Sequence, residues 1–172
     1  MGLLFQPRWC GERVTDRALA DAGHGAIDRP RTFLSALEAV VLGDVHRFAT
    51  LFTDDVVFRS PHVASESLAS LRVAVGSPED SLTDVTIVVI GLDGLADKVI
   101  GEWRVEALFA HPVLFDDRLL IEPTGGQVRL PGASVAEFRG HRIKAFRHYF
   151  DDTELLAGVP GAPSHLRWSF DR

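Results

Sequence analysis

Residues 132–156, GASVAEFRGHRIKAFRHYFDDTELL, contain two predicted strands, a tight turn and a short helix. Arg139-Gly140-His141 supplies the turn, because a glycine between two alternating segments is typical of a β-hairpin. Successive side chains of a strand point to opposite sides, so Ser134, Ala136 and Phe138 share one face of the first strand. For the second strand the alternation predicts one face with Phe146, His148 and Phe150, and another with Ile143, Ala145, Arg147 and Tyr149.

His148 is the first candidate catalytic residue, because it stands between Phe146 and Phe150 on one predicted face. A titratable group flanked by apolar surface is poorly hydrated when charged, so we expect the pKa of this imidazole to be lowered. A neutral imidazole can act as a base or as a hydrogen-bond donor near pH 7. The alternative is a histidine of the pocket wall that has no catalytic role.

The order of elements around His148 resembles a known family. A long strand, a turn with glycine, a strand that ends in Arg147-His148-Tyr149-Phe150-Asp151 and a short Leu-rich helix are similar to the end of nuclear-transport-factor-2-like proteins, in particular SnoaL-like polyketide cyclases and limonene-epoxide hydrolases. The resemblance covers residues 30–159. It implies an α+β fold in which a curved, mostly antiparallel sheet forms a cone around an apolar pocket that the N-terminal helices close. Residues 1–29 are then an N-terminal arm, and residues 160–172 are a C-terminal tail.

Periodicity and breaker residues place the other elements. A helix is predicted to begin near Pro30 and to end at Gly43, because its apolar residues recur at helical spacing. Asp44 is expected to cap a second short helix, and Ser65 or Ser67 a third that runs to Val75. The remaining predictions are strands at 56–60, 85–91, 99–110, 113–122 and 127–138, a turn at 91–94 and a helix at 153–157.

The strand predicted at 99–110 carries a charged row with two possible interpretations. Glu102, Arg104, Glu106 and Leu108 point to one side, and Trp103 points to the other. In the first interpretation the row is a solvated face with cross-strand ion pairs, since charged side chains are mostly exposed. In the second the row lines the pocket, where a buried Arg104 must be paired and could hold one carboxylate in a chosen protonation state.

The resemblance implies roles for some of these residues. Limonene-epoxide hydrolases carry Arg-Val-Asp on this strand, which matches Arg104-Val105-Glu106 and would make Arg104 the bridge and Glu106 the acid, with His148 in place of the second carboxylate. The tyrosine and asparagine that hold water in that family fall on Phe58 and Ser60. Because phenylalanine cannot hold water, SnoaL-like cyclase chemistry fits better than epoxide hydrolysis.

The remaining candidates are residues that would contact the substrate. SnoaL-like proteins often carry a pocket histidine near the end of the strand at 99–110, where His111 stands; since Pro112 follows it, His111 can also be a bend residue. The full set of expected substrate contacts is Phe58, Ser60, Glu102, Leu108, His111, Phe146 and Phe150.

Composition excludes several classes of function. The 172 residues carry a net charge of −6 with no basic run, which argues against binding to nucleic acid or to a membrane surface. The longest apolar runs, such as 85–92, are too short to cross a bilayer, and the N-terminus has no signal-peptide pattern, so we expect a cytoplasmic protein. Its arginine-rich, alanine-rich composition suggests a bacterial source. No HExxH, CxxC, GxGxxG or GxxxxGK[ST] motif is present, so no metal or cofactor is expected.

The sequence therefore predicts a cofactor-free general acid/base enzyme for a small, largely apolar substrate, of the cyclase, isomerase or dehydratase type. Two alternatives remain: an epoxide hydrolase, and a non-catalytic domain that binds a small ligand or mainly dimerises. The same fold can serve all of these functions. A homodimer is expected, because apolar residues on both faces of several strands need more cover than a few helices give.

Overall fold

The computed structural model describes residues 28–75, 82–115 and 119–150. The helices are α1 (Arg29–Val41), α2 (Phe48–Leu51) and α3 (Leu68–Val75). The strands are β1 (Phe52–Arg59), β2 (Ala64–Ser65), β3 (Leu82–Leu95), β4 (Lys98–Phe109), β5 (Val113–Phe115), β6 (Leu119–Ile121), β7 (Gln127–Arg139) and β8 (Arg142–Phe150). The predicted N-terminal arm, C-terminal tail and helix at 153–157 lie outside the described residues.

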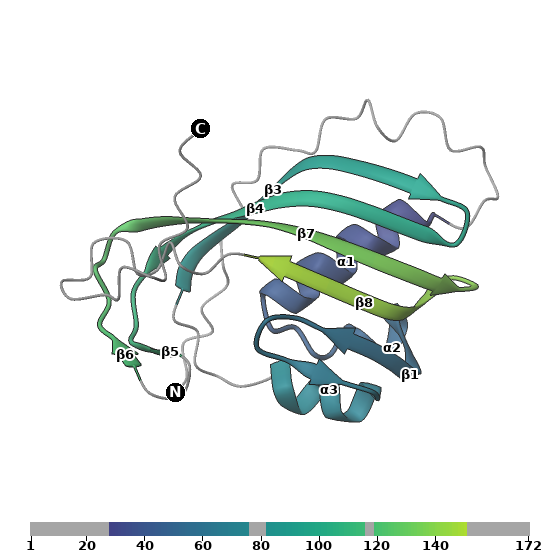
Figure 1. Cartoon of the computed structure of the whole chain (residues 1–172), viewed down its shortest axis with the longest axis horizontal. Coiled ribbons are helices and arrows are strands. Elements are labelled where there is room, and N and C mark those ends of the chain that lie inside the picture. The colour runs from purple at the N-terminus through teal and green to yellow at the C-terminus, as the bar shows by residue number, and fades with distance from the viewer. Residues whose placement is uncertain (1–27, 76–81, 116–118, 151–172) are drawn as a thin grey trace, which may run out of the picture.

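The main sheet has the strand order β2-β1-β8-β7-β4-β3. Adjacent strands of this sheet pair antiparallel, except β1 and β8, which run parallel. Strand β5 pairs with β6 in a separate small hairpin. Figure 1 shows the long strands β3, β4, β7 and β8 side by side and bent along their length. This curved, mostly antiparallel sheet with few helices confirms the predicted α+β class.

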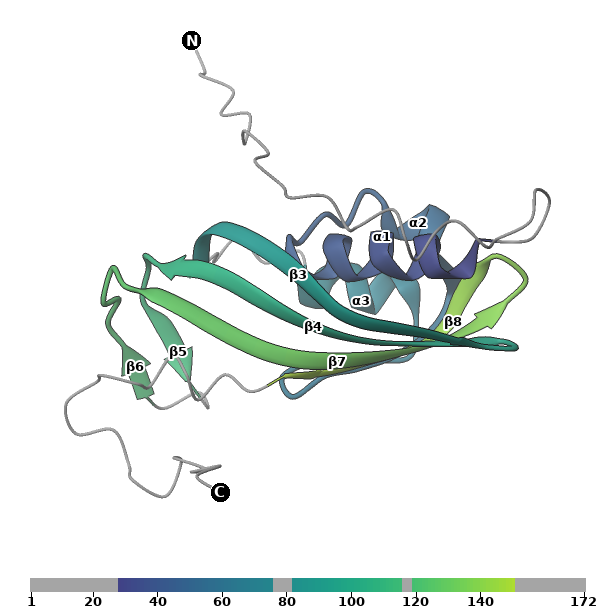
Figure 2. The ribbon, with the colours of Figure 1, turned by 90° about the horizontal axis from the view of Figure 1, so that it is seen from above.

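Helices α1, α2 and α3 lie on one side of the sheet, as Figure 2 shows, and α1 crosses the strands at an angle in Figure 1. We call this covered side the inner face and the opposite side the outer face. Phe33 of α1 explains how the helix approaches so closely: a Cβ at Gly101 of β4 would lie 2.6 Å from its ring. Gly101 thus leaves room for the Phe33 ring, which also packs against Phe146 at a centroid distance of 5.9 Å.

Local capping explains where the helices begin. The carboxylate of Asp28 accepts a hydrogen bond from the backbone N–H of Arg31 at 3.0 Å, and Pro30 occupies the first turn of α1. Gly43, with φ of +66°, follows the helix end, as predicted. Ser67 accepts from the backbone N–H of Ser70 at 3.2 Å and so caps α3.

Three local predictions are wrong. Asp44 caps no helix, because residues 45–46 form a turn and α2 starts at Phe48 without a side-chain cap. The turn predicted at 91–94 is strand, since a bulge beside Val89 takes Gly91 into β3 and the chain reverses at residues 96–97 instead. The strand predicted at 113–122 is the β5–β6 hairpin.

Within the described part of the chain, no helix is long and apolar enough to cross a membrane.

Candidate functional site

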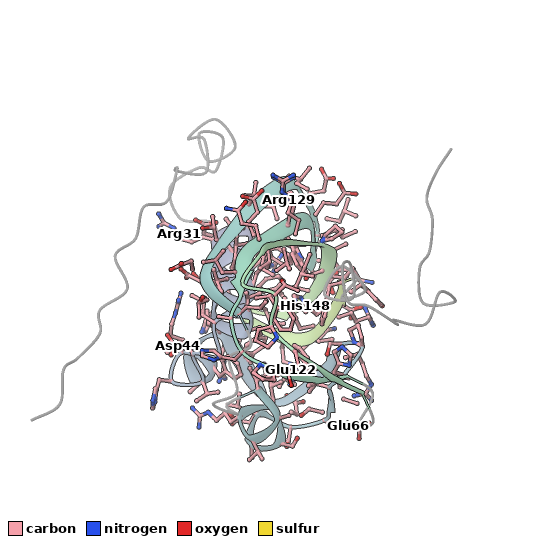
Figure 3. All side chains as sticks on the ribbon, turned by 90° about the vertical axis from the view of Figure 1, so that its left-hand side faces the viewer. Arg31, Asp44, Glu66, Glu122, Arg129 and His148 are labelled. Carbon is pink, nitrogen blue, oxygen red and sulfur yellow. The ribbon has the colours of Figure 1, made fainter. Side chains whose placement is uncertain are left out.

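The inner face of the sheet carries His148. Alternate residues of β4, from Gly101 through Trp103 to Phe109, are buried on this face, and Ser134, Ala136 and Phe138 of β7 are buried beside them. On β8 the inward residues include Phe146 and His148, as the alternation predicts. In Figure 3, which looks along the strands, His148 lies inside the curve of the sheet and Arg129 lies at its margin.

Ile143 is a correction to the predicted alternation. It was expected on the face of Arg147 and Tyr149, but it is fully buried in the core. The register explains the change: Ala145 pairs with Glu137, whereas Ile143 pairs with Phe138, so β8 has one extra residue at Lys144. Such a bulge moves the preceding side chains to the other face of the strand.

A hydrogen-bonded chain joins His148 to two other buried side chains of the inner face. Nε1 of Trp103 donates to Oγ of Ser134 at 2.9 Å, and Oγ of Ser134 lies 2.8 Å from Nδ1 of His148. The indole and the imidazole also stack, with centroids 4.7 Å apart and planes inclined by 14°. These residues come from β4, β7 and β8, so the pairing of these strands assembles the chain.

Gly132 makes this arrangement possible, because it pairs with Trp103 on β4 and with Phe150 on β8. A Cβ at this position would lie 2.3 and 2.4 Å from two carbons of the indole and 2.6 Å from the carbonyl oxygen of Tyr149. The missing side chain therefore lets the indole lie across β7 and reach His148.

We expect the Gly132→Ala variant to lose about 1–3 kcal/mol of unfolding free energy, the usual cost of an extra methyl group in a packed core. Denaturant melts measure this loss. Gly91→Ala is the matched control, because a Cβ on this strand glycine meets nothing within 4 Å. Its stability should stay within about 1 kcal/mol of the wild type or rise. Equal melts of the two variants would contradict the placement of the indole over Gly132.

Two further aromatic rings flank the imidazole of His148 along β8. Phe150 lies 5.3 Å and Phe146 5.9 Å from its centroid. The residue is 5% exposed, and this burial lowers the pKa of His148 from 6.5 to about 4, in the direction predicted. Charging the ring in such surroundings would remove its hydration without a compensating anion. His148 is therefore neutral at pH 7.

The other residues expected to contact a substrate lie in different settings. Phe58 is buried and stacks on Phe146 at 5.9 Å, so it belongs to the same aromatic cluster. The hydroxyl of Ser60 accepts from the backbone N–H of Val63 at 3.0 Å and holds a turn. His111 is exposed at a bend after β4, and Leu108 lies in the outward row of that strand.

The charged row of β4 lies on the outer face, which corrects the pocket interpretation. Arg104 and Glu106 pair with each other, Nη2 to Oε1 at 2.7 Å, and their side chains are 37% and 39% exposed. Arg129 of β7 adds a longer contact of 3.8 Å to the same oxygen, and Glu102 is exposed. Since Trp103 packs into the core, its neighbours on the strand must point away from it. The sheet thus separates the Arg104–Glu106 pair from His148, and Arg104 cannot bridge Glu106 to the inner face.

We expect Arg104→Ala and Glu106→Gln each to change the unfolding free energy by about 0–1 kcal/mol, as is usual for exposed ion pairs. Two denaturant melts at moderate salt test this. A pair buried inside the cone would behave differently, since breaking it costs roughly 3–5 kcal/mol. A loss of that size in Arg104→Ala would contradict the outward placement.

Across residues 28–75, 82–115 and 119–150, no group of three or more His, Cys, Asp or Glu side chains could hold a metal ion.

Comparisons with known proteins agree with this architecture. The family model described as SnoaL-like domain matches residues 33–146. Among solved structures, IdmH of Streptomyces antibioticus, a candidate polyketide cyclase, is 18% identical with a TM-score of 0.61 over 76% of this chain and 96% of its own. A candidate SnoaL-like polyketide cyclase of Jannaschia sp. CCS1 is 13% identical, with a TM-score of 0.62 over 83% and 100% of the two chains.

An epoxide hydrolase is also similar in structure. The LEH-like epoxide hydrolase of M. tuberculosis is 15% identical, with a TM-score of 0.54 over 75% of this chain and 86% of its own. No curated protein matches the chain significantly. At these identities the solved structures show a shared nuclear-transport-factor-2-like fold.

Proposed function

Because this chain belongs to the SnoaL-like domain family, we propose that it is a cofactor-free enzyme that acts by acid/base chemistry on a small, largely apolar substrate. Ring closure, isomerisation and dehydration beside a carbonyl group are the reactions that we propose. Each of them begins with, or passes through, the loss of a proton from the carbon next to that carbonyl. The protein must therefore supply a group that handles or stabilises the developing charge.

One observation carries the proposal: His148 is a titratable side chain buried on the inner face. The buried polar side chains of the described residues are Thr53, Ser65, Ser134 and His148, so no described carboxylate shares this interior. A group whose pKa is strongly shifted by burial inside a fold that binds small molecules is a candidate for catalysis. We therefore assign the central role to His148.

The surroundings of His148 favour an apolar, flat substrate. Trp103, Phe146 and Phe150 present ring faces and edges around the imidazole, and Phe58 extends the same cluster. Such walls bind by excluding water from apolar surface, and they leave orientation to a few polar groups. A substrate with one carbonyl group on an aromatic or alicyclic skeleton fits this description.

The two alternatives from the sequence are weaker. Epoxide hydrolysis would need an acid and a held water molecule, but Glu106 lies on the outer face, Phe58 cannot hold water, and the Ser60 hydroxyl is engaged by its own turn. A non-catalytic binding domain requires no chemistry from His148, because a buried histidine with a satisfied hydrogen bond can be purely structural. Turnover distinguishes this alternative from an enzyme.

The test uses 2-acetylnaphthalene, a flat apolar ketone, incubated with the full chain in D₂O. Proton NMR follows the exchange of its methyl protons, which requires enolisation. We expect exchange faster than in buffer with the same concentration of imidazole. Binding of the ketone with an exchange rate equal to that control would favour the non-catalytic class.

We also propose that the chain forms a homodimer through the outer face of its sheet. Apolar side chains remain exposed there, namely Ile100, Tyr149 and Val57. Light scattering of the wild type should give the mass of a dimer, and Ile100→Glu should give a monomer, because burying an unpaired charge in the interface is costly. Val73→Glu on α3 is the control, since Val73 is exposed away from this face. A monomeric wild type at micromolar concentration would contradict the proposal.

A further inference from the structure

We propose that Trp103 and Ser134 are positioning residues that keep the proton of the His148 imidazole on Nε2, so that the ring offers a hydrogen-bond donor to a substrate carbonyl or enolate oxygen. This inference rests on the proposed function for its chemical meaning. The tautomer itself is a property of the free protein.

The direction of the hydrogen bonds follows from what each group can do. The indole N–H of Trp103 can only donate, so the Ser134 oxygen accepts at 2.9 Å. Ser134 is 0% exposed, and a buried hydroxyl hydrogen without an acceptor is costly. Among the described residues the acceptor within reach is Nδ1 of His148, at 2.8 Å. Nδ1 therefore carries the lone pair, and a neutral ring then carries its proton on Nε2.

The alternative tautomer would leave the Ser134 hydroxyl hydrogen without an acceptor. If Nδ1 carried the proton, Oγ of Ser134 would accept from both Trp103 and His148, and its own hydrogen would point into the apolar surroundings of the ring. The two hydrogen bonds thus form a chain with one direction, from Trp103 through Ser134 to His148. Removal of the Ser134 hydroxyl removes this preference.

The tautomer decides what His148 can do to a substrate. Nε2 already holds a proton and cannot accept another without charging a buried ring, so it does not serve as the base in this state. It can donate to an oxygen that becomes negative. When the bond between the α-carbon and its proton breaks, the proton passes to a water molecule or buffer base. The electron pair forms the C=C bond of an enolate, whose oxygen the Nε2–H then stabilises.

This assignment narrows the substrate class. The group that meets His148 must be an acceptor, such as a ketone, an ester or another carbonyl oxygen, and it must lie at an edge of a flat apolar molecule. An ammonium group, which can only donate, would find a donor facing it. A neutral imidazole has this electrophilic role in another enzyme, triosephosphate isomerase, and our assignment extends the same chemistry to His148.

Long-range ¹H–¹⁵N NMR of the histidine-labelled full chain at pH 7 tests the proposal without any substrate. The resonances that disappear in His148→Asn identify His148. We expect its Nδ1 to give the signal of an unprotonated nitrogen and Nε2 that of a protonated one. In Ser134→Ala the signals should shift towards the tautomer mixture of an unrestrained imidazole, and Ser134→Thr, which keeps the hydroxyl, should restore the wild-type pattern.

A protonated Nδ1 in the wild type would overturn the proposal, and so would a tautomer ratio that Ser134→Ala leaves unchanged. If Ser134→Ala fails to fold, the spectra of the wild type and of Ser134→Thr still show which nitrogen of His148 carries the proton. The proposed function fails separately: an Nε2–H tautomer together with no ketone exchange would reject catalysis and keep the positioning role. Catalysis with a protonated Nδ1 would keep the enzyme and reject the positioning role.

Discussion

Replacing His148 with asparagine is expected to slow the exchange of 2-acetylnaphthalene methyl protons by roughly 10²–10⁴-fold, the range lost when one acid, base or oxyanion donor is removed. Asparagine is chosen because its Oδ1 takes the place of Nδ1 and can still accept the hydroxyl proton of Ser134. The variant thus keeps the hydrogen-bonded chain from Trp103 and loses the group at Nε2. Initial rates of exchange measured by proton NMR give the ratio.

The matched control is His141→Asn. His141 is exposed in the turn between β7 and β8, so the same substitution there should leave the exchange rate unchanged. A His148→Asn variant that exchanges the ketone as fast as the wild type would remove His148 from the chemistry. The binding-domain alternative would then describe the protein better.

The second large effect is a loss of stability in mild acid. The pKa of His148 is lowered by burial from 6.5 to about 4. Between these values the unfolded chain binds a proton at this site and the folded chain does not. The unfolding free energy therefore falls as the pH drops from about 6.5 towards 4, by roughly 3 kcal/mol in total. Above pH 6.5 neither the folded nor the unfolded chain binds a proton at His148, so the unfolding free energy is no longer reduced by this site.

Urea melts at a series of pH values measure the effect, and the difference between wild type and His148→Asn isolates it. Carboxylates also titrate at the lower end of this range: Arg147 beside Glu137 holds the pKa of that carboxyl below its usual value. Their contributions are common to both proteins and cancel in the difference. His141→Asn should keep the wild-type slope. Parallel curves for wild type and His148→Asn would contradict the burial of His148.

Alternation and local turn chemistry were sufficient to predict much of the fold. The glycine turn at 139–141 and the period of two predict the β7–β8 hairpin and the inward placement of His148. These features depend on neighbours in sequence, which are visible without knowing the strand order. The face of Ile143 could not be predicted from its neighbours in sequence. A bulge adds one residue to the strand, and no local pattern of apolar residues marks its position.

The partners of His148 could not be predicted in this way. Ser134 is 14 residues away and Trp103 lies 31 residues before Ser134, so only the order β4-β7-β8 and its register bring them together. One signal was available in the sequence: Ser134 is a polar residue on a face otherwise predicted to carry Ala136 and Phe138. Gly132 within a strand was a second signal, since strand glycines often mark a close approach of another group.

The sequence alone could not decide which face of the sheet Arg104 and Glu106 occupy. Alternation along β4 separates these charges from Trp103 but does not say which side the helices cover. The resemblance to limonene-epoxide hydrolases favoured the pocket side, because the Arg-Val-Glu spacing matches. The desolvation cost of burying charges favoured the outside, and the exposed ion pair follows that rule.

The pKa of His148 in the full chain is the most direct test of a neutral, buried catalytic imidazole. Its ring-proton shifts can be followed by NMR from pH 8 down to pH 5, with His148→Asn to identify the signals. We predict that His148 shows no midpoint in this range, because its pKa is about 4. A midpoint near 6.5 would show a hydrated, unshifted imidazole and would contradict the site proposed for the inner face.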